Sequence, residues 1–308
     1  MECKPHPGLA IRVALFYFTL AGVCQSIQAQ SQMRFRLVHD TLVVVPLMAD
    51  RQGPFDFVLD TGADTTIVDQ SLAIKLSLPS LRRVQHTTLA GVGSLPLNSI
   101  ATLSAGWADV NDIPALVEDL AEVRKIDDRI EGIAGQDFLS HFNYLLDYRS
   151  RSVRIEIDNE IRDAIEGDTL PIEMTGNRMI VASVAQSQGR ERLRLLLDSG
   201  ANSVVLFPRA SQALDLPAQG HGLEVTSSGQ VGLQVGRIPV LTVGSQQFRE
   251  ITAALPAAEP AEGIGDGLLP TALFQTLYVN NREGFVMLNP RAKKNWLSHG
   301  PAVIGQMR

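Results

Sequence analysis

The sequence predicts an all-β protein: two pseudo-symmetric, closed β lobes with a cleft between them and few short helices. The main observation is a repeat, because the segment at residues 57–64 recurs at 195–202. Each copy is an apolar run that ends in Asp, followed by Thr or Ser, Gly and Ala. Short β-rich stretches separated by Gly, Pro and Asn turns along most of the chain indicate the strands.

The N-terminal segment, residues 1–29, is predicted to be a signal peptide. Lys4 and Arg12 precede an apolar stretch at 13–24 that suits a signal-peptide core and is short for a membrane span. We therefore expect a periplasmic or extracellular protein with no stable membrane insertion after cleavage. An uncleaved N-terminal anchor is the alternative. A lipoprotein is disfavoured because Val23 stands where a small residue should precede Cys24.

Composition argues against several classes of function. Both cysteines, Cys3 and Cys24, lie in the N-terminal segment, so a cleaved chain has no thiol nucleophile, disulfide or cysteine-based zinc site. The net charge is −6 and no basic patch indicates nucleic-acid binding. The six histidines are scattered without ligand spacing, so we expect no metal and no other cofactor.

The repeat divides the rest of the chain into an N-terminal lobe, residues 30–160, and a C-terminal lobe, residues 161–290. A flexible tail is expected over 291–308. In each lobe strand-like material precedes the Asp-bearing loop. An acid-Gly-apolar element follows the loop at a similar distance, at Glu131 and at Asp266, before a final turn and strand.

Short helices are expected directly after each Asp-bearing segment, over residues 70–76 and 208–214. Pro208 suits the first position of the second of these helices. A further helix is expected over 119–129 in the first lobe.

The repeated loops suit hydrolysis by an activated water, since each supplies one carboxylate at the end of a rigid strand. If the loops meet across a two-fold axis, Asp60 and Asp198 lie within about 3 Å of each other and share one proton. The ionised carboxylate then takes a proton from water while the protonated one polarises a carbonyl. A lone Asp-Thr-Gly is usually a plain strand-to-turn junction, but two matched copies favour the catalytic interpretation.

The residues beside each aspartate support such a pairing. Gly62 and Gly200 have no side chain, which permits the two loops to approach backbone to backbone. Thr61 and Ser199 each carry a hydroxyl that can donate and accept, so each can bond to the opposite loop.

The first loop and the element around Glu131 resemble the active-site loop and the later apolar-apolar-Gly element of the retropepsin-like (retroviral-type) aspartic protease family. The resemblance covers roughly residues 33–290 and is looser in the second half. Retroviral members pair two identical chains, whereas this chain carries both lobes in tandem. The resemblance implies an aspartic endopeptidase with Asp60 and Asp198 as the catalytic pair, a polypeptide substrate and a monomer with an internal pseudo-two-fold.

The same resemblance implies substrate-binding positions. Asp64 matches the family position that bonds the substrate backbone, and Asn202 replaces that acid in the second half, so the two sides of the cleft should differ. Gly91 and Gly93 belong to a candidate flap hairpin in the first half, and Gly229 to one in the second. Ordinary surface hairpins are the alternative for both.

Two departures from the pattern matter. Ala63 and Ala201 stand where pepsin-like enzymes usually have Ser or Thr, so the pair should be less acidic and the pH optimum milder than pepsin's. Pro270 stands where the first half has Gly135. Two other interpretations stay open: a catalytically inactive peptide- or protein-binding module of the same fold, and an enzyme whose lobes pair between chains.

Overall fold

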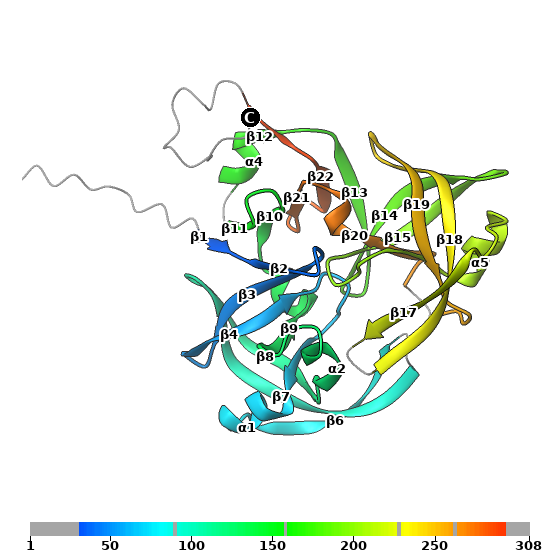
Figure 1. Ribbon diagram of the computed structural model, residues 1–308. Helices are drawn as coiled ribbons and strands as arrows, with labels where there is room; N and C mark the ends of the chain where they lie inside the picture. The colour runs from blue at the N-terminus through cyan, green and yellow to red at the C-terminus, as the bar shows by residue number, and fades with distance from the viewer. Residues whose placement is uncertain (1–30, 89–90, 157–158, 227–228, 261–263, 294–308) are drawn as a thin grey trace, which may run out of the picture.

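The computed structural model describes residues 31–88, 91–156, 159–226, 229–260 and 264–293, and it shows a mostly β protein (Figure 1). The all-β prediction is confirmed, since the five α-helices in these ranges are only four to six residues long. None of the described helices is long and apolar enough to cross a membrane. The expected signal peptide lies outside the described residues, as does the tail beyond residue 293.

The first half of the chain contains strands β1 to β11 and helices α1 to α3. Their bounds are β1 (Ser31–Arg34), β2 (Arg36–Val38), β3 (Leu42–Ala49), β4 (Gln52–Leu59), β5 (Thr66–Asp69), α1 (Gln70–Lys75), β6 (Ser80–Thr88), β7 (Gly91–Ala105), β8 (Ala108–Glu118), α2 (Ala121–Arg124), β9 (Ile130–Ala134), α3 (Gln136–Leu139), β10 (Asn143–Asp147) and β11 (Ser152–Glu156).

The second half contains strands β12 to β23, two α-helices and a 3₁₀ helix, η1. Their bounds are α4 (Glu160–Ala164), β12 (Ile165–Glu166), β13 (Thr169–Thr175), β14 (Arg178–Gln186), β15 (Arg190–Asp198), β16 (Val204–Leu206), α5 (Pro208–Ala213), β17 (Gly220–Thr226), β18 (Gly229–Val243), β19 (Gln246–Leu255), β20 (Gly267–Pro270), η1 (Thr271–Leu273), β21 (Thr276–Asn280), β22 (Phe285–Leu288) and β23 (Arg291–Ala292).

The two halves have the same strand order. The first runs β2-β3-β4-β9-β5-β8-β7-β6 and the second runs β13-β14-β15-β20-β16-β19-β18-β17. An extra pairing bends each sheet back on itself, β3 with β7 in the first half and β14 with β18 in the second. The repeat in the sequence is therefore a repeat of topology: Asp60 directly follows β4, and Asp198 is the last residue of the equivalent strand, β15.

A six-stranded antiparallel arrangement, β1-β11-β10-β21-β22-β13, joins the two halves (Figure 1). Its central pair is β10 with β21, in which Tyr144 lies opposite Val279 and Asp147 opposite Thr276. Strands from both predicted lobes thus share one sheet. The predicted boundary between residues 160 and 161 lies within α4, and β23 at the start of the predicted tail pairs with β12.

The strands that deliver the aspartates are buried on both faces. The last three residues of β4 (57–59) and the apolar run of β15 (195–197) are buried without alternation. Each of these strands has a parallel neighbour, β9 beside β4 and β20 beside β15. Continuous apolar runs are typical of strands covered on both sides, so both motifs end in a well-packed core.

The helix expected over 119–129 is wrong in extent. Only α2 is helical, since the N–H of Ile126 already bonds to the carbonyl of Val123 and the chain then turns toward β9. The turn is held by Asp127, whose carboxylate accepts from the backbone N–H of Arg129 at 3.2 Å and from its guanidinium. The other two helices, α1 and α5, each end one residue before the predicted end.

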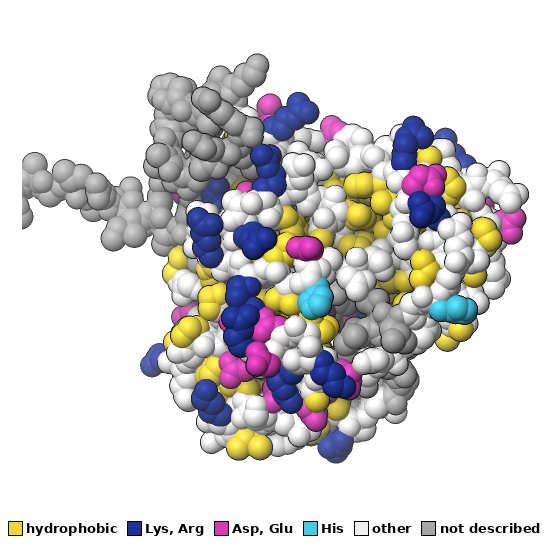
Figure 2. Space-filling model, in the orientation of Figure 1, with side chains coloured by type: hydrophobic (Ala, Val, Ile, Leu, Met, Phe, Trp, Pro, Cys, Tyr) yellow, Lys and Arg dark blue, Asp and Glu magenta, His cyan; other side chains and the backbone are white. Residues whose placement is uncertain are grey.

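Charged side chains of both signs are intermixed on the face of the first lobe seen in Figure 2. In the same lobe Arg36 bridges Asp56 at 2.7 Å and also pairs with Asp127, so side chains of opposite charge lie side by side.

Candidate active site

Each candidate catalytic aspartate stands at the end of a strand that has a second strand behind it. Asp60 directly follows β4, and its backbone N–H donates to the carbonyl of Ala134 in β9 at 2.9 Å. Asp198 is the last residue of β15 and lies opposite Pro270 of β20. The parallel pairing of these strands is therefore the same in both halves, although Pro270 replaces the glycine of the first half.

The carboxyl groups of Asp60 and Asp198 lie where the two loops meet, close enough for each to affect the pKa of the other. Oδ1 of Asp60 accepts the backbone N–H groups of Gly62 at 2.8 Å and Ala63 at 3.2 Å. Oδ1 of Asp198 accepts the equivalent pair of its own loop, from Gly200 at 2.7 Å and Ala201 at 3.0 Å. The two loops thus hold their carboxyls with the same arrangement of backbone hydrogen bonds.

The glycines in these loops are required by the closeness of the carboxyls. A Cβ atom on Gly62 would lie 2.6 Å from Cγ of Asp198, and one on Gly200 would lie 2.8 Å from Oδ2 of Asp60. Each aspartate therefore occupies the space that a side chain on the opposite loop would fill.

Thr61 and Ser199 bond across to the opposite loop. Oγ1 of Thr61 donates to the carbonyl of Leu197 at 2.7 Å and accepts the N–H of Ser199 at 3.0 Å. Oγ of Ser199 donates to the carbonyl of Leu59 at 2.7 Å and accepts the N–H of Thr61 at 3.0 Å. Both side chains are almost fully buried, so these four bonds lie in a dry interface.

Burial dominates the acid–base behaviour of the pair. It raises the pKa of Asp198 well above the ordinary value, and the charge of Asp60 adds to this rise while the N–H donors oppose it. Burial also raises the pKa of Asp60, against the hydrogen bonds from Gly62, Asp198 and Ala63. Two carboxyls in contact do not both ionise readily, so the pair retains one shared proton over a wide pH range.

A cleft of about 700 Å³ contains both aspartates. Residues of both lobes line it, and most of them are apolar. From the first lobe these include Leu42, Val58, Ile67, Val84, Leu97, Leu116, Val123, Ile126 and Ile133, and from the second Leu196, Phe207, Ile264 and Leu268.

The predicted substrate-binding residues divide into two groups. Asp64 lines the cleft and pairs with Arg178 of β14 at 2.6 Å. Burial raises the pKa of Asp64, while Arg178 and His86 oppose the rise. Asn202, also predicted to bind substrate, is exposed and is not among the described residues that line the cleft.

The three candidate flap glycines lie in two hairpins, β6–β7 and β17–β18. Gly91 lies opposite Thr88, and Gly229 lies opposite Thr226, so each is the first residue after its turn. Gly93 is exposed on β7. The turns themselves, residues 89–90 and 227–228, lie outside the described residues, and the three glycines are not among the described residues that line the cleft.

The structure adds cleft residues that sequence reasoning missed, chiefly Arg82, His86 and Arg178. The alternation of Arg82, Val84 and His86 along one strand is a period-2 pattern that could have indicated one shared face. Nothing local indicated Arg178, because its partner Asp64 is far away in the sequence.

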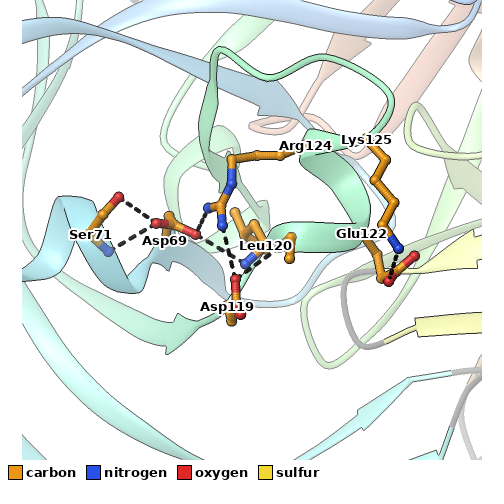
Figure 3. Close-up of polar contacts among 8 residues, drawn as sticks. Asp69, Ser71, Asp119, Leu120, Glu122, Arg124 and Lys125 are labelled. Atoms are coloured by element: carbon orange, nitrogen blue, oxygen red, sulfur yellow. Dashed lines mark hydrogen bonds and ion pairs between the residues drawn. The ribbon is translucent and has the colours of Figure 1, made fainter.

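A polar network also holds α2, which supplies Val123 to the cleft wall (Figure 3). Asp69 caps α1 by accepting the N–H of Ser71 at 2.9 Å, and it also accepts the N–H of Leu120 at 3.1 Å. The same carboxylate pairs with Arg124 of α2, which bonds to Asp119 at 3.0 Å as well. Because Asp69 ends β5, the network ties α2 to the sheet behind the active-site loop.

The opposite lobe also contacts α2. Nε2 of Gln230, near the tip of the β17–β18 hairpin, donates to Glu122 of α2 at 3.0 Å. Lys125 pairs with the other oxygen of Glu122 at 2.5 Å. The hairpin of the second lobe therefore reaches across to the first.

Buried polar groups brace the first loop from behind. Gln136 of α3 donates from Nε2 to the carbonyl of Thr61 at 3.2 Å. The carboxylate of Asp137 accepts the backbone N–H of Thr66 at 2.9 Å and its hydroxyl at 2.7 Å. Burial raises the pKa of Asp137 to about 6, against these hydrogen bonds from Thr66.

Two equivalent β lobes that bring an Asp-Thr-Gly and an Asp-Ser-Gly loop together in one cleft define the aspartic protease class of fold and site. Family models support both halves: gag-polyprotein putative aspartyl protease matches residues 45–141, and aspartyl protease matches residues 182–271. No curated protein matches the chain. The two halves of the chain thus carry aspartyl protease domains in tandem, which confirms the predicted resemblance to the retropepsin-like family.

Proposed function

We propose that this protein is an aspartic endopeptidase that hydrolyses peptide bonds with a water activated between Asp60 and Asp198. The observation that carries the proposal is the closeness of the two carboxyls, one from each lobe, inside a cleft. A shared proton gives the pair one general base and one general acid at the same time.

The reaction balances with these two groups alone. The ionised carboxylate removes a proton from the water as its oxygen bonds to the carbonyl carbon, and the protonated carboxyl donates its proton to the carbonyl oxygen. As the resulting tetrahedral diol collapses, the C–N bond breaks and the leaving amine takes up the proton that the pair removed from water. One hydroxyl proton of the diol passes to the pair, which is again singly protonated, and the other stays on the product carboxylic acid.

The cleft suits an extended peptide. It is lined from both lobes by apolar side chains, and Asp64 lines it with its carboxylate held by Arg178. An extended chain exposes backbone N–H and C=O groups that can pair with strands beside such a cleft, as in strand-like peptide recognition.

Asparagine variants of the two aspartates test the proposal. Asp198→Asn and Asp60→Asn each remove the general acid–base pair and should lower cleavage of a peptide library by about a thousandfold. Asp168→Asn is the matched control, because Asp168 is exposed and outside the cleft. Cleavage is followed by mass spectrometry, and thermal unfolding checks that each variant is folded.

A peptide-binding module of the same fold predicts a different result. If the protein is such a module, the wild type cleaves no peptide, and the Asp198→Asn variant binds peptides with the same affinity as the wild type. Wild-type cleavage that survives in both asparagine variants would also contradict the proposal.

We further propose that the chain is exported and acts as a monomer with an internal pseudo-two-fold. The apolar N-terminal stretch supports export, and the presence of both Asp-bearing loops in one chain supports a monomeric site. N-terminal sequencing of the exported protein and sizing of the active species test these two points. Activity found only in a dimer would favour a site assembled between chains.

A further inference from the structure

We propose that the cleft prefers substrates with a glutamate side chain on one side of the scissile bond, and that Arg82 is the residue that selects it. This inference rests on the proposed peptidase function and names the substrate class of the same site.

Arg82 faces the cleft from β6. Arg82, Val84 and His86 lie two residues apart and all line the cavity, as does Gln85 between the last two. Arg83, between the first two, is not among the described cavity residues, and its Nε donates to Oγ of Ser94 on the neighbouring strand at 3.3 Å. The side chains of these two adjacent arginines therefore differ in their surroundings: Arg82 lines the cleft, and Arg83 bonds to the neighbouring strand.

Arg82 provides a positive charge that no protein group neutralises among the residues that the structure describes. Apart from the catalytic pair, the ionisable side chains that line the cleft are Asp64, Arg82, His86 and Arg178. Asp64 already pairs with Arg178 at 2.6 Å. The side chain of Arg82 is exposed and makes no ion pair or hydrogen bond within the described residues.

Apolar side chains surround the approach to this charge. Arg82 lies opposite Leu97 in the β6–β7 pairing, and Leu97 lies opposite Leu116 in the β7–β8 pairing. Both leucines line the cleft, as does Val84. A glutamate side chain combines an aliphatic stem with a terminal carboxylate that a guanidinium can bind through two parallel hydrogen bonds.

The charge is present on one side only. Counted from the hairpin ends, where Thr88 lies opposite Gly91 and Thr226 opposite Gly229, the position of Arg82 corresponds to Gly220 in β17. Gly220 has no side chain, so the second lobe carries no equivalent cation. The acidic preference should therefore fall on one side of the scissile bond and not on the other.

The test uses octapeptides in which a single Glu, or a Gln as its neutral match, is moved along an otherwise apolar sequence. For the wild type, kcat/KM should be about fivefold higher for Glu than for Gln at one position, the size of a partly exposed ion pair. Added salt should reduce the ratio. Arg82→Met should bring the ratio to about one, and Arg82→Glu should favour Lys over Glu at that position.

Arg83→Met and Arg83→Glu are the matched controls, since they make the same charge changes on the adjacent residue and should keep the preference for Glu. Equal rates for Glu and Gln peptides at all positions in the wild type would overturn the inference and leave the peptidase proposal standing. The inference would also be overturned, with the peptidase proposal still standing, if the Arg83 variants lost the preference for Glu as fully as the Arg82 variants.

Affinity measurements separate this inference from the peptidase proposal. If the wild type cleaves none of the peptides, the peptidase proposal fails, and fluorescence anisotropy with the same Glu and Gln peptides still measures selection. A preference for Glu that Arg82→Met abolishes supports the inference, and equal affinities overturn it.

Discussion

Thr61 and Ser199 exchange hydrogen bonds across the axis that relates the two lobes, each accepting the backbone N–H of the other at 3.0 Å. Each hydroxyl also donates at 2.7 Å to a carbonyl in the strand of the opposite lobe. A hydroxyl is suited to this position because it donates and accepts at once. The two loops that carry the aspartates are thereby fastened to each other directly.

Removing one hydroxyl should loosen this fastening. Ser199→Ala leaves the N–H of Thr61 and the carbonyl of Leu59 buried without a partner, which should lower the free energy of unfolding by about 1–3 kcal/mol. Urea unfolding measures the change. Ser203→Ala is the control, since Ser203 lies in the same loop and its side chain has no hydrogen bond among the described residues. Equal losses in both variants would contradict the role assigned to Ser199.

A methyl group on Gly200 should separate the catalytic carboxyls. Its Cβ would lie 2.8 Å from Oδ2 of Asp60, closer than van der Waals contact permits. We expect Gly200→Ala to lower kcat at least about a hundredfold, because displacement of a general acid–base pair removes its contribution. Gly189→Ala serves for comparison, since no described atom lies within 4 Å of its added Cβ. A Gly200→Ala enzyme with normal kcat would show that the loops tolerate separation.

The pH–rate profile should be bell-shaped with an optimum above about pH 3. Burial raises the pKa of both Asp60 and Asp198, so the shared proton is lost only as the pH rises through the upper apparent pKa of the pair. Activity falls above that value, and it also falls at low pH once both carboxyls are protonated. The profile of kcat/KM measures both limbs.

A variant tests the cause of the mild optimum. Ala63→Ser adds a hydroxyl donor beside Asp60 and should move the acidic limb to lower pH, since a donor to the charged form lowers the pKa. An optimum below about pH 3 in the wild type would contradict the expectation.

Asp69 should contribute strongly to stability, and its contribution should be larger at pH values above the ordinary pKa of an aspartate than at pH values below it. Asp69→Ala removes the cap of α1 and leaves the buried N–H of Leu120 unpaired, for a loss of about 2–3 kcal/mol. Asp119→Ala, at the exposed end of the same network, should cost less than about 1 kcal/mol. Urea unfolding compares the two variants, and equal losses would contradict the central place of Asp69.

The pH dependence of this contribution has a definite sign. Burial acts to raise the pKa of Asp69, but the hydrogen bonds from Ser71, Leu120 and Arg124 together keep that pKa below the ordinary value. The stabilisation is therefore present above about pH 4 and is lost as the pH falls below it. The difference in unfolding free energy between wild type and Asp69→Ala should shrink on acidification, and a constant difference would contradict this sign.

Local patterns in the sequence were sufficient for the fold class, the repeat and the two Asp-bearing loops. An apolar run followed by Asp, a hydroxyl residue and Gly specifies a buried strand and the turn that ends it, and both are short-range properties. The predicted extent of the helix at 119–129 was wrong. Asp69, which comes from a distant strand, binds the N–H of Leu120 at the start of α2, and a turn ends the helix after Arg124.

The sequence by itself determined which residues recur: the two aspartates, their glycines and the hydroxyls beside them. Only the tertiary structure decided which other side chains share the cleft, placing Arg82 and Arg178 there and leaving Asn202 outside the described lining. It also decided that β1, β10 and β11 pair within a sheet that includes strands of the second half. The physical reason is that lining and pairing depend on the register between strands far apart in the chain, and no local residue pattern specifies that register.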